Sequence, residues 1–144
     1  MMEGKLLLPE EILNRWAELS PLIDDFLNKG YGESTAFDIA QKCINLQYQC
    51  WVVDLDSELV CVCITRIDEY PTFNSLHILG IAGVGLEGWK HFHPTLENFA
   101  KINNCTRITQ WGRQGWARML KGLTGVNNEE YKVIHTVMAM ELTT

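Results

Sequence analysis

The segment LHILGIAGVGLEGWKHF, residues 76–92, constrains the fold more than any other part of the chain. It joins an apolar, β-type run to a helical pattern through Gly83, Gly85 and Gly88. Glycines at such a junction allow a tight turn and a close approach of the backbone to a ligand. The segment therefore predicts a strand that turns directly into a helix. The turn is either purely structural or a cradle for an anion at the helix N-terminus.

The three glycines have the G-x-G-x-x-G spacing of a dinucleotide-binding fingerprint, but their surroundings argue against that function. The fingerprint normally follows the first strand of a βαβ unit, and an acidic residue ends the next strand about 20 residues later. Here the glycines follow the third expected strand of the central region, and the later strand NCTRITQ has no acidic residue at its end. A Walker phosphate loop is excluded because the sequence contains no G-K-[ST].

Periodicity and turn residues predict one domain over residues 1–144. Three helices are expected first, over 8–19, 20–30 and 35–47, with Ser20 and Ser34 as N-caps of the second and third. Strands follow over 49–56, 59–67 and 75–82, then a helix over 89–103, a strand over 105–111, a short helix over 115–123 and a last strand over 131–142. This order predicts an α/β fold. The strands 75–82 and 105–111 should be parallel, because a helix connects them.

Composition excludes several classes of function. The net charge of −6 argues against a nucleic-acid-binding protein, although Arg107, Arg113, Arg118 and Lys121 form one local basic group. No apolar run reaches the roughly 18 residues of a membrane span, and no signal peptide is expected. The odd number of five cysteines favours free thiols in a reducing, cytoplasmic setting.

Two cysteines raise the alternative of a metal site. Cys61 and Cys63 alternate on an expected strand and so share a face. No second pair of cysteines or histidines has a suitable spacing, and His91 and His93 point to different faces of a helix. Buried thiols that pack as small apolar groups are the better interpretation, and no metal is expected.

The order of elements and the glycine turn resemble the GNAT superfamily of acyl-CoA-dependent N-acetyltransferases. The resemblance implies a mixed, mostly antiparallel central sheet flanked by helices. The family's loop, Arg/Gln-x-x-Gly-x-Gly/Ala, corresponds to residues 80–85 of this sequence. The resemblance therefore implies that the pyrophosphate of acetyl-CoA contacts the turn and the helix start, at Ala82, Gly83, Val84, Gly85 and Gly88.

The same resemblance suggests a catalytic residue and also shows departures from the family. His77 stands on the strand where several GNAT enzymes carry a glutamate as general base, and it is the candidate base here. The alternative is a histidine at the edge of the core that bonds the backbone. Gly80 replaces the family's Arg or Gln, Glu87 adds a negative charge at the helix start, and Lys121 lies near the position of the family's tyrosine. These departures weaken the expectation of tight acetyl-CoA binding.

The segment CTRITQWGRQGWARML resembles a group of short GNAT-like proteins encoded by tailed phages and prophages. In GRQGW, Trp116 is expected to pack on the sheet, and Arg113, Arg118 and Lys121 are candidates for contact with a protein partner of the virion or the host.

Two functions follow from the sequence, and its status as an enzyme stays open. The favoured hypothesis is a phage-type GNAT-like protein without efficient acetyl transfer, which acts through protein contacts in the host cytoplasm or the virion and requires no cofactor. The alternative is an acetyl-CoA-dependent N-acetyltransferase.

Overall fold

The computed structural model describes residues 2–29, 32–83, 86–111, 123–134 and 136–143. These residues belong to two compact units, Met1–Trp111 and Gly112–Thr144. All the named helices and strands lie in the first unit, which also contains the residues of the candidate site.

The first unit is built on a five-stranded mixed sheet in the order β1-β2-β3-β4-β5. The strands are β1 (Met2–Leu6), β2 (Tyr48–Leu55), β3 (Glu58–Glu69), β4 (Asn74–Gly83) and β5 (Cys105–Gln110). Neighbours pair antiparallel from β1 to β4, whereas β4 and β5 pair parallel. The predictions of a mostly antiparallel sheet and of the parallel pair on either side of a helix are confirmed.

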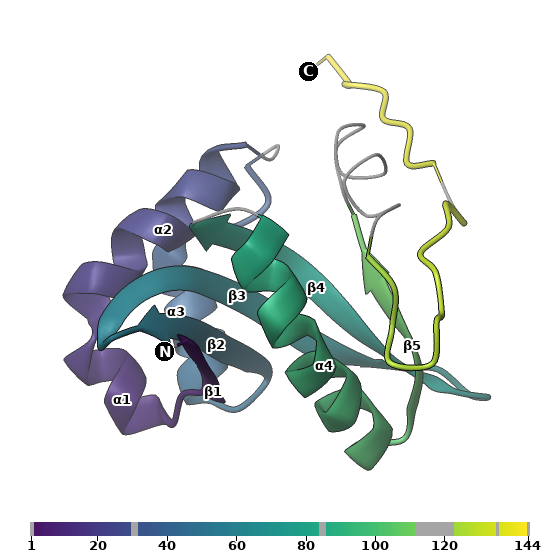
Figure 1. Ribbon diagram of the computed structural model, residues 1–144. Coiled ribbons are helices and arrows are strands. Elements are labelled where there is room, and N and C mark those ends of the chain that lie inside the picture. The colour runs from purple at the N-terminus through teal and green to yellow at the C-terminus, as the bar shows by residue number, and fades with distance from the viewer. Residues whose placement is uncertain (1, 30–31, 84–85, 112–122, 135, 144) are drawn as a thin grey trace. The chain divides into compact units, whose positions relative to one another are not determined.

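Helices cover both faces of this sheet. The helices α1 (Pro9–Asn14), α2 (Trp16–Asn28) and α3 (Ala36–Ile44) pack on one face, and α4 (Leu86–Ile102) lies across the other (Figure 1). The layer between α1–α3 and the sheet is one apolar cluster of buried side chains: Leu7, Ile12, Leu19, Ile23, Ile39, Cys43, Cys50, Val52, Val62 and Ile64.

Trp51 of β2 holds α4 against the opposite face. Its ring meets Phe92 and Phe99 edge-on, with centroid distances of 5.6 and 5.0 Å. Its indole nitrogen donates to the Thr65 hydroxyl at 2.9 Å, which in turn donates to the Gln49 side chain at 2.8 Å. The buried polar end of the indole is therefore satisfied, and its apolar body anchors the helix.

The sequence analysis did not identify β1. This edge strand, MEGKL, pairs antiparallel with β2 from Met2 opposite Leu55 to Leu6 opposite Trp51. A Cβ on Gly4 would lie 2.9 Å from the ring of Phe92, so a glycine is needed for α4 to pack there. The strand depends on these contacts with distant residues and has little β-propensity of its own.

The predicted break between the first two helices at Ser20 and Pro21 was wrong. The chain breaks at Arg15 instead, and Pro21 lies inside α2. Arg15 donates from both terminal nitrogens to the Asp54 carboxylate, at 2.7 and 3.0 Å, which binds the break to β2. Leu19 and Ile23, on either side of the proline, are both buried in the core. Their burial outweighs the backbone hydrogen bond that a proline removes from a helix.

The N-cap of α3 is Thr35 rather than the expected Ser34. The Thr35 hydroxyl accepts a hydrogen bond from the Asp38 amide at 3.2 Å, and the Asp38 carboxylate accepts one from the Thr35 amide at 3.2 Å. This is a reciprocal capping box. Ser34 bonds only weakly, to the Thr35 carbonyl at 3.4 Å.

The helix and the strand predicted after β5 are not confirmed. The described residues of 131–142 form no strand, so the prediction of a last strand there was wrong. The second unit contains an isolated antiparallel bridge between Thr124 and Glu130 among its described residues. The predicted helix 115–123 lies outside the described residues, apart from Leu123.

Among the helices that the structure describes, none is long and apolar enough to cross a membrane.

Gly80 of β4 lies directly against Phe26 of α2. A Cβ at this position would lie 2.1 Å from Cδ1 of the half-buried Phe26 ring. The ring therefore occupies the space that any side chain at position 80 would need.

We predict that Thr35→Ala lowers the free energy of unfolding by about 1 kcal/mol, the usual cost of losing a helix N-cap. The matched change Ser34→Ala should cost less than about 0.5 kcal/mol, as is usual for an exposed position. Urea denaturation followed by circular dichroism measures both. Equal losses, or a larger loss for Ser34→Ala, would restore Ser34 as the cap.

We predict that Gly80→Ala costs about 1–3 kcal/mol, because the new methyl group overlaps the Phe26 ring. In the Phe26→Ala background the same change should cost almost nothing, since the ring has been removed. A double-mutant cycle with denaturant unfolding gives the coupling, which we expect to be at least 1 kcal/mol. Additive losses would show that another neighbour restricts position 80.

Candidate active site at the divergence of β4 and β5

The central feature of the candidate site is the point at which two parallel strands separate. β4 and β5 pair from Asn74 opposite Cys105 to Ile78 opposite Gln110. β4 then continues to Gly83, and within the described part of the chain residues 79–83 have no strand partner on the β5 side. The backbone of this stretch pairs with β3 on one side only.

A β-bulge marks the separation. The register of β3 and β4 shifts between Ile64, which faces Gly80, and Thr65, which faces Ile78. Leu79 is therefore the extra residue, and it follows directly after the last residue of β4 that pairs with β5. A bulge bends its strand and increases the local twist, so β4 turns away from β5 at this residue.

The unpaired stretch leads to the glycine turn. Gly83 ends β4 with a φ of +122°, and a Cβ there would lie 2.1 Å from the Val60 carbonyl oxygen, so this position needs glycine. α4 begins at Leu86, and Gly88 is buried in its first turn. Of the predicted cofactor residues, Ala82 is also buried, whereas Val84 and Gly85 lie outside the described residues. The structure thus places a helix N-terminus close in sequence to the open edge of β4.

The residue that departs most from the GNAT loop has a structural explanation. Gly80 stands in β4 under the Phe26 ring, so the Arg or Gln of the family would not fit without displacing that ring. Position 80 therefore has no side chain that could contact an anion. Backbone N–H groups would be the hydrogen-bond donors instead.

His77 lies on the paired part of β4, beside the separation. Its Nδ1 is 2.9 Å from the Thr109 hydroxyl of β5, and its ring meets Trp111 edge-on at 5.0 Å. Burial, and to a lesser extent the positive charge of Arg66, lower the pKa of His77 to about 4. At pH 7 a histidine with a pKa of about 4 carries a proton in about one molecule per thousand. His77 is therefore neutral and bonded through one nitrogen, and it is a weak base.

Two buried polar atoms, one at the end of the β4–β5 pairing and one at the start of α4, lack hydrogen-bond partners among the described residues. One is Oε1 of Gln110, the last residue of β5, and the other is Nε1 of Trp89, in the first turns of α4. A buried polar group without a partner costs about 1–3 kcal/mol, so both are ready to accept or donate a bond to a ligand. Sequence analysis did not identify either residue. The sequence signal that could have identified Gln110 was a polar residue near the end of the predicted strand 105–111.

The cysteines are buried thiols, as expected. All five are free and buried, and burial raises the pKa of Cys61 to about 11 and that of Cys63 well above its ordinary value. The described residues contain no group of histidine, cysteine, aspartate or glutamate that could hold a metal ion. The predicted partner-contact residues Arg113, Arg118 and Lys121, together with Trp116, lie outside the described residues.

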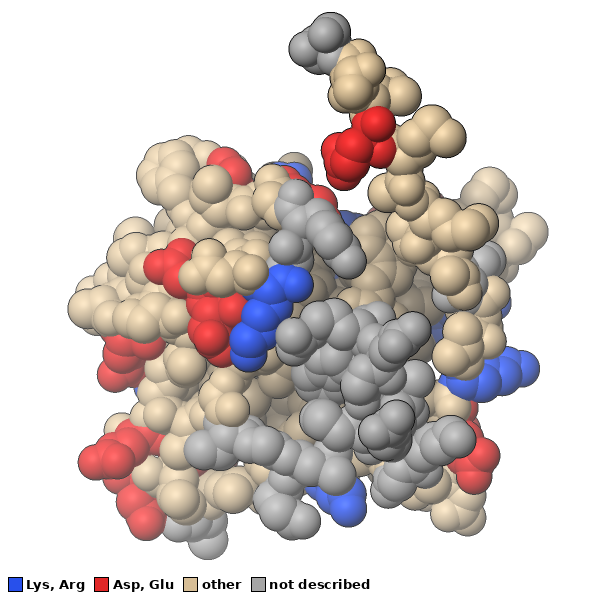
Figure 2. Space-filling view, turned by 90° about the horizontal axis from the view of Figure 1, so that it is seen from above, with Lys and Arg blue, Asp and Glu red and all other residues tan. Residues whose placement is uncertain are grey.

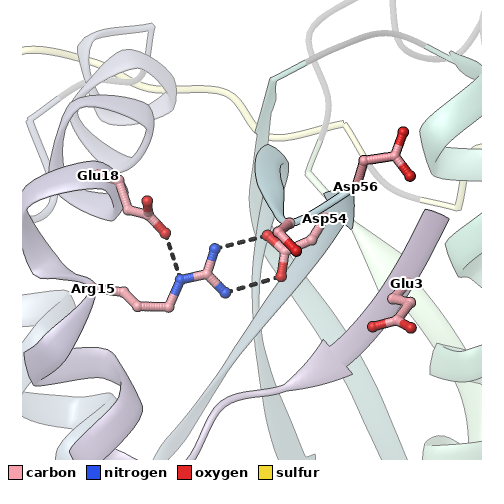
Figure 3. A pocket seen from close by; sticks show the side chains of 6 residues that line it. Glu3, Arg15, Glu18, Asp54 and Asp56 are labelled. Carbon is pink, nitrogen blue, oxygen red and sulfur yellow. Dashed lines mark hydrogen bonds and ion pairs between the residues drawn. The ribbon is translucent and has the colours of Figure 1, made fainter. Parts of the chain in front are cut away.

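A separate acidic hollow of about 410 Å³ lies where the first helices meet the β2–β3 turn. Figure 3 shows Arg15 between Glu18 and Asp54, with Asp56 and Glu3 completing the labelled wall. The bonds to Asp54 raise the pKa of Arg15 above its ordinary value. Arg15 thus joins the helices to β2, and the surrounding carboxylates make this hollow unfavourable for a phosphate.

The face of the molecule seen from above carries charges of both signs. Viewed from above, the described side chains show blue and red groups side by side, with no continuous blue area (Figure 2). Among the described side chains of this face there is no cluster of lysines and arginines of the kind that nucleic-acid backbones require.

No protein-family model matches the chain, and no curated protein matches it. Solved structures match the chain over nearly its whole length. Ribosomal-protein-alanine N-acetyltransferase from Brucella melitensis biovar Abortus 2308 superposes with a TM-score of 0.71 at 11% identity, over 99% of this chain and 100% of that one. A GNAT family acetyltransferase from Staphylococcus aureus gives a TM-score of 0.66 at 15% identity, over 98% of each chain.

A predicted acetyltransferase from Clostridium acetobutylicum, solved with acetyl-CoA, has a TM-score of 0.64 at 16% identity, over 99% of this chain and 96% of that one. Identities this low show the fold and nothing finer. The chain has the fold of the GNAT acetyltransferases.

Proposed function

We propose that this chain binds acetyl-CoA between β4 and β5 and transfers the acetyl group to an amine. The observation that carries the proposal is the open edge of β4 over residues 79–83. Backbone donors and acceptors on a strand edge bind an extended, amide-bearing ligand as an added strand would. The pantetheine arm of acetyl-CoA has such amides, and the helix N-terminus that follows favours its phosphates.

The residues around the separation fit this ligand. Gln110 offers a buried carbonyl oxygen and Trp89 a buried N–H, and both lack partners among the described residues. Bound acetyl-CoA supplies the acetyl thioester, and transfer forms an amide C–N bond while the C–S bond breaks and the amine proton leaves with the free thiol. Because His77 is neutral, Nε2 can accept a hydrogen bond from the amine when Nδ1 donates to Thr109. Its low pKa makes it an acceptor that orients the amine through a hydrogen bond, and the amine proton ends on the thiol that leaves.

A second candidate is protein contact without acetyl transfer, in a virion or with a host factor. The exposed apolar side chains of the second unit support it: Val126, Val133, Ile134, Val137, Met138, Met140 and Leu142. Exposed apolar side chains in such number are typical of a segment that binds another surface. A protein of this kind would bind its partner and show no response to acetyl-CoA.

We predict that acetyl-CoA at one hundred times its dissociation constant stabilises the protein by about 2.7 kcal/mol. Differential scanning fluorimetry with up to millimolar acetyl-CoA measures the shift in Tm. Gln110→Leu should weaken the response without destabilising the free protein, because it removes a buried oxygen that lacks a partner. The exposed Gln47→Leu is the matched control and should respond like the wild type.

No shift at millimolar acetyl-CoA would overturn the acetyltransferase proposal and favour the contact function. Gly83→Val, the obvious loop variant, is unsuitable as a test. Its Cβ would overlap the Val60 carbonyl at an unfavourable φ, so the variant loses stability whether or not the loop binds a ligand.

We predict that His77 makes stability fall as the pH is lowered from about 6.5 to about 4. The unfolded chain takes up the proton near pH 6.5, whereas the folded chain takes it up only near pH 4. The unfolded state therefore binds more protons in this window and is favoured as the pH falls. Urea unfolding at several pH values should give a smaller slope for His77→Gln than for the wild type. Identical slopes would show that His77 titrates normally in the folded protein.

A further inference from the structure

His77 belongs to a row of polar side chains that crosses four strands. Strand register places Tyr48 of β2 opposite Arg66 of β3, Arg66 opposite His77 of β4, and His77 opposite Thr109 of β5. Residues that pair directly across strands point to the same face of a sheet. The row therefore lies on one face, at the part of β4 that is still paired with β5.

A second row runs beside the first. Asp68 of β3 faces Ser75 of β4, and Ser75 faces Arg107 of β5. These residues are two positions from Arg66, His77 and Thr109, so they share the same face. We call the two rows together the polar platform: Tyr48, Arg66, Asp68, Ser75, His77, Arg107 and Thr109.

The charges on and beside the platform are mainly positive. Lys42 of α3 lies against Tyr48, with Nζ 3.4 Å from the hydroxyl and 5.0 Å from the ring centre. Lys42, Arg66 and Arg107 together contribute three positive charges here, whereas Asp68 contributes one negative charge. The net charge of the whole chain is −6. Asp68 accepts from Arg66 Nε at 2.8 Å and so neutralises part of the charge of Arg66. The platform is therefore positive relative to the rest of the protein.

Aromatic rings hold both arginines in place. The Arg66 guanidinium lies 5.9 Å from the ring centre of the exposed Trp111, and the exposed Arg107 lies 4.5 Å from that of Phe73. A guanidinium that stacks on a ring still has N–H groups at its edge that can bind a planar anion. The stacking fixes its position before the anion binds. This geometry suits a carboxylate, which accepts two parallel bonds from one arginine.

Ser75 gives an independent indication of a ligand. Its side chain is 1% exposed, and its hydroxyl has no hydrogen-bond partner among the described residues. It stands between Asp68 and Arg107 in the second row. A buried hydroxyl in this position can donate to an anion that approaches Arg107.

We propose that the amine acetylated by this protein also carries a carboxylate, which Arg66, Arg107 and Ser75 bind beside His77. The proposal rests on the acetyltransferase function above and specifies its acceptor as an amino acid or a similar small amino acid-like molecule. A purely cationic amine would meet the positive charges of Arg66, Arg107 and Lys42 and is disfavoured.

The test compares each amino acid with the amine that lacks only its carboxylate. Thiol release from acetyl-CoA is measured with tyrosine against tyramine and with leucine against 3-methylbutylamine. We expect kcat/KM to be at least tenfold higher for the α-amino acid of each pair. Arg107→Gln should reduce this ratio at least fivefold. The matched control Lys101→Gln, an exposed cation in the last turn of α4, should keep it.

Binding of the products gives a readout that does not need catalysis. Calorimetry should show N-acetyltyrosine binding at least tenfold more tightly than N-acetyltyramine, and Arg107→Gln should remove the difference. Equal binding of the two, or tighter binding of N-acetyltyramine, overturns the carboxylate proposal even if acetyl-CoA binds. Tighter binding of the acid in a protein that gives no Tm shift with acetyl-CoA supports the anion site and rejects the acetyltransferase function. Preference for O-phosphoethanolamine over glycine as acceptor would replace the carboxylate by a phosphate and overturn the proposal as stated.

Discussion

The separation of β4 from β5 is the constraint on which the candidate site depends. One extra residue, Leu79, bends β4 directly after its last pairing with β5. The bend leaves residues 79–83 with an open edge and leads them to the turn before α4. Without the bulge the two strands would continue side by side, and their backbone groups would satisfy one another rather than a ligand.

Packing on both faces of the sheet maintains this geometry. On one face, Phe26 of α2 fills the space over Gly80, just beyond the bulge. On the other face, Trp51 holds Phe92 and Phe99 of α4, so the helix that follows the turn has a fixed position on β2. The Arg15–Asp54 ion pair joins the first helices to the same strand. The open edge is thus held by packing on both faces of the sheet, which suits a site that must hold a ligand without rearranging.

The two charged regions of the first unit have opposite signs and separate locations. The hollow around Arg15 has an excess of carboxylates, whereas the platform around His77 has an excess of cations. An acceptor with a carboxylate is attracted to the platform and repelled by the hollow. Charge therefore favours one approach to His77, on the sheet face that carries Arg66 and Arg107.

Local patterns in the sequence were sufficient for the class of fold, four of the five strands, α4 and the parallel pair, because apolar periodicity and the length of a helical connection are local properties. They also located the glycine turn, since Gly83 needs a φ that few other residues adopt. Only the tertiary structure decided β1, the break at Arg15, the cap at Thr35 and the absence of a strand in the described residues of 131–142. The bulge at Leu79, the two polar rows and the low pKa of His77 belong to the same group. The physical reason is common to all of them: each depends on a register or contact between residues far apart in the chain, and strand register has no signature in a single segment.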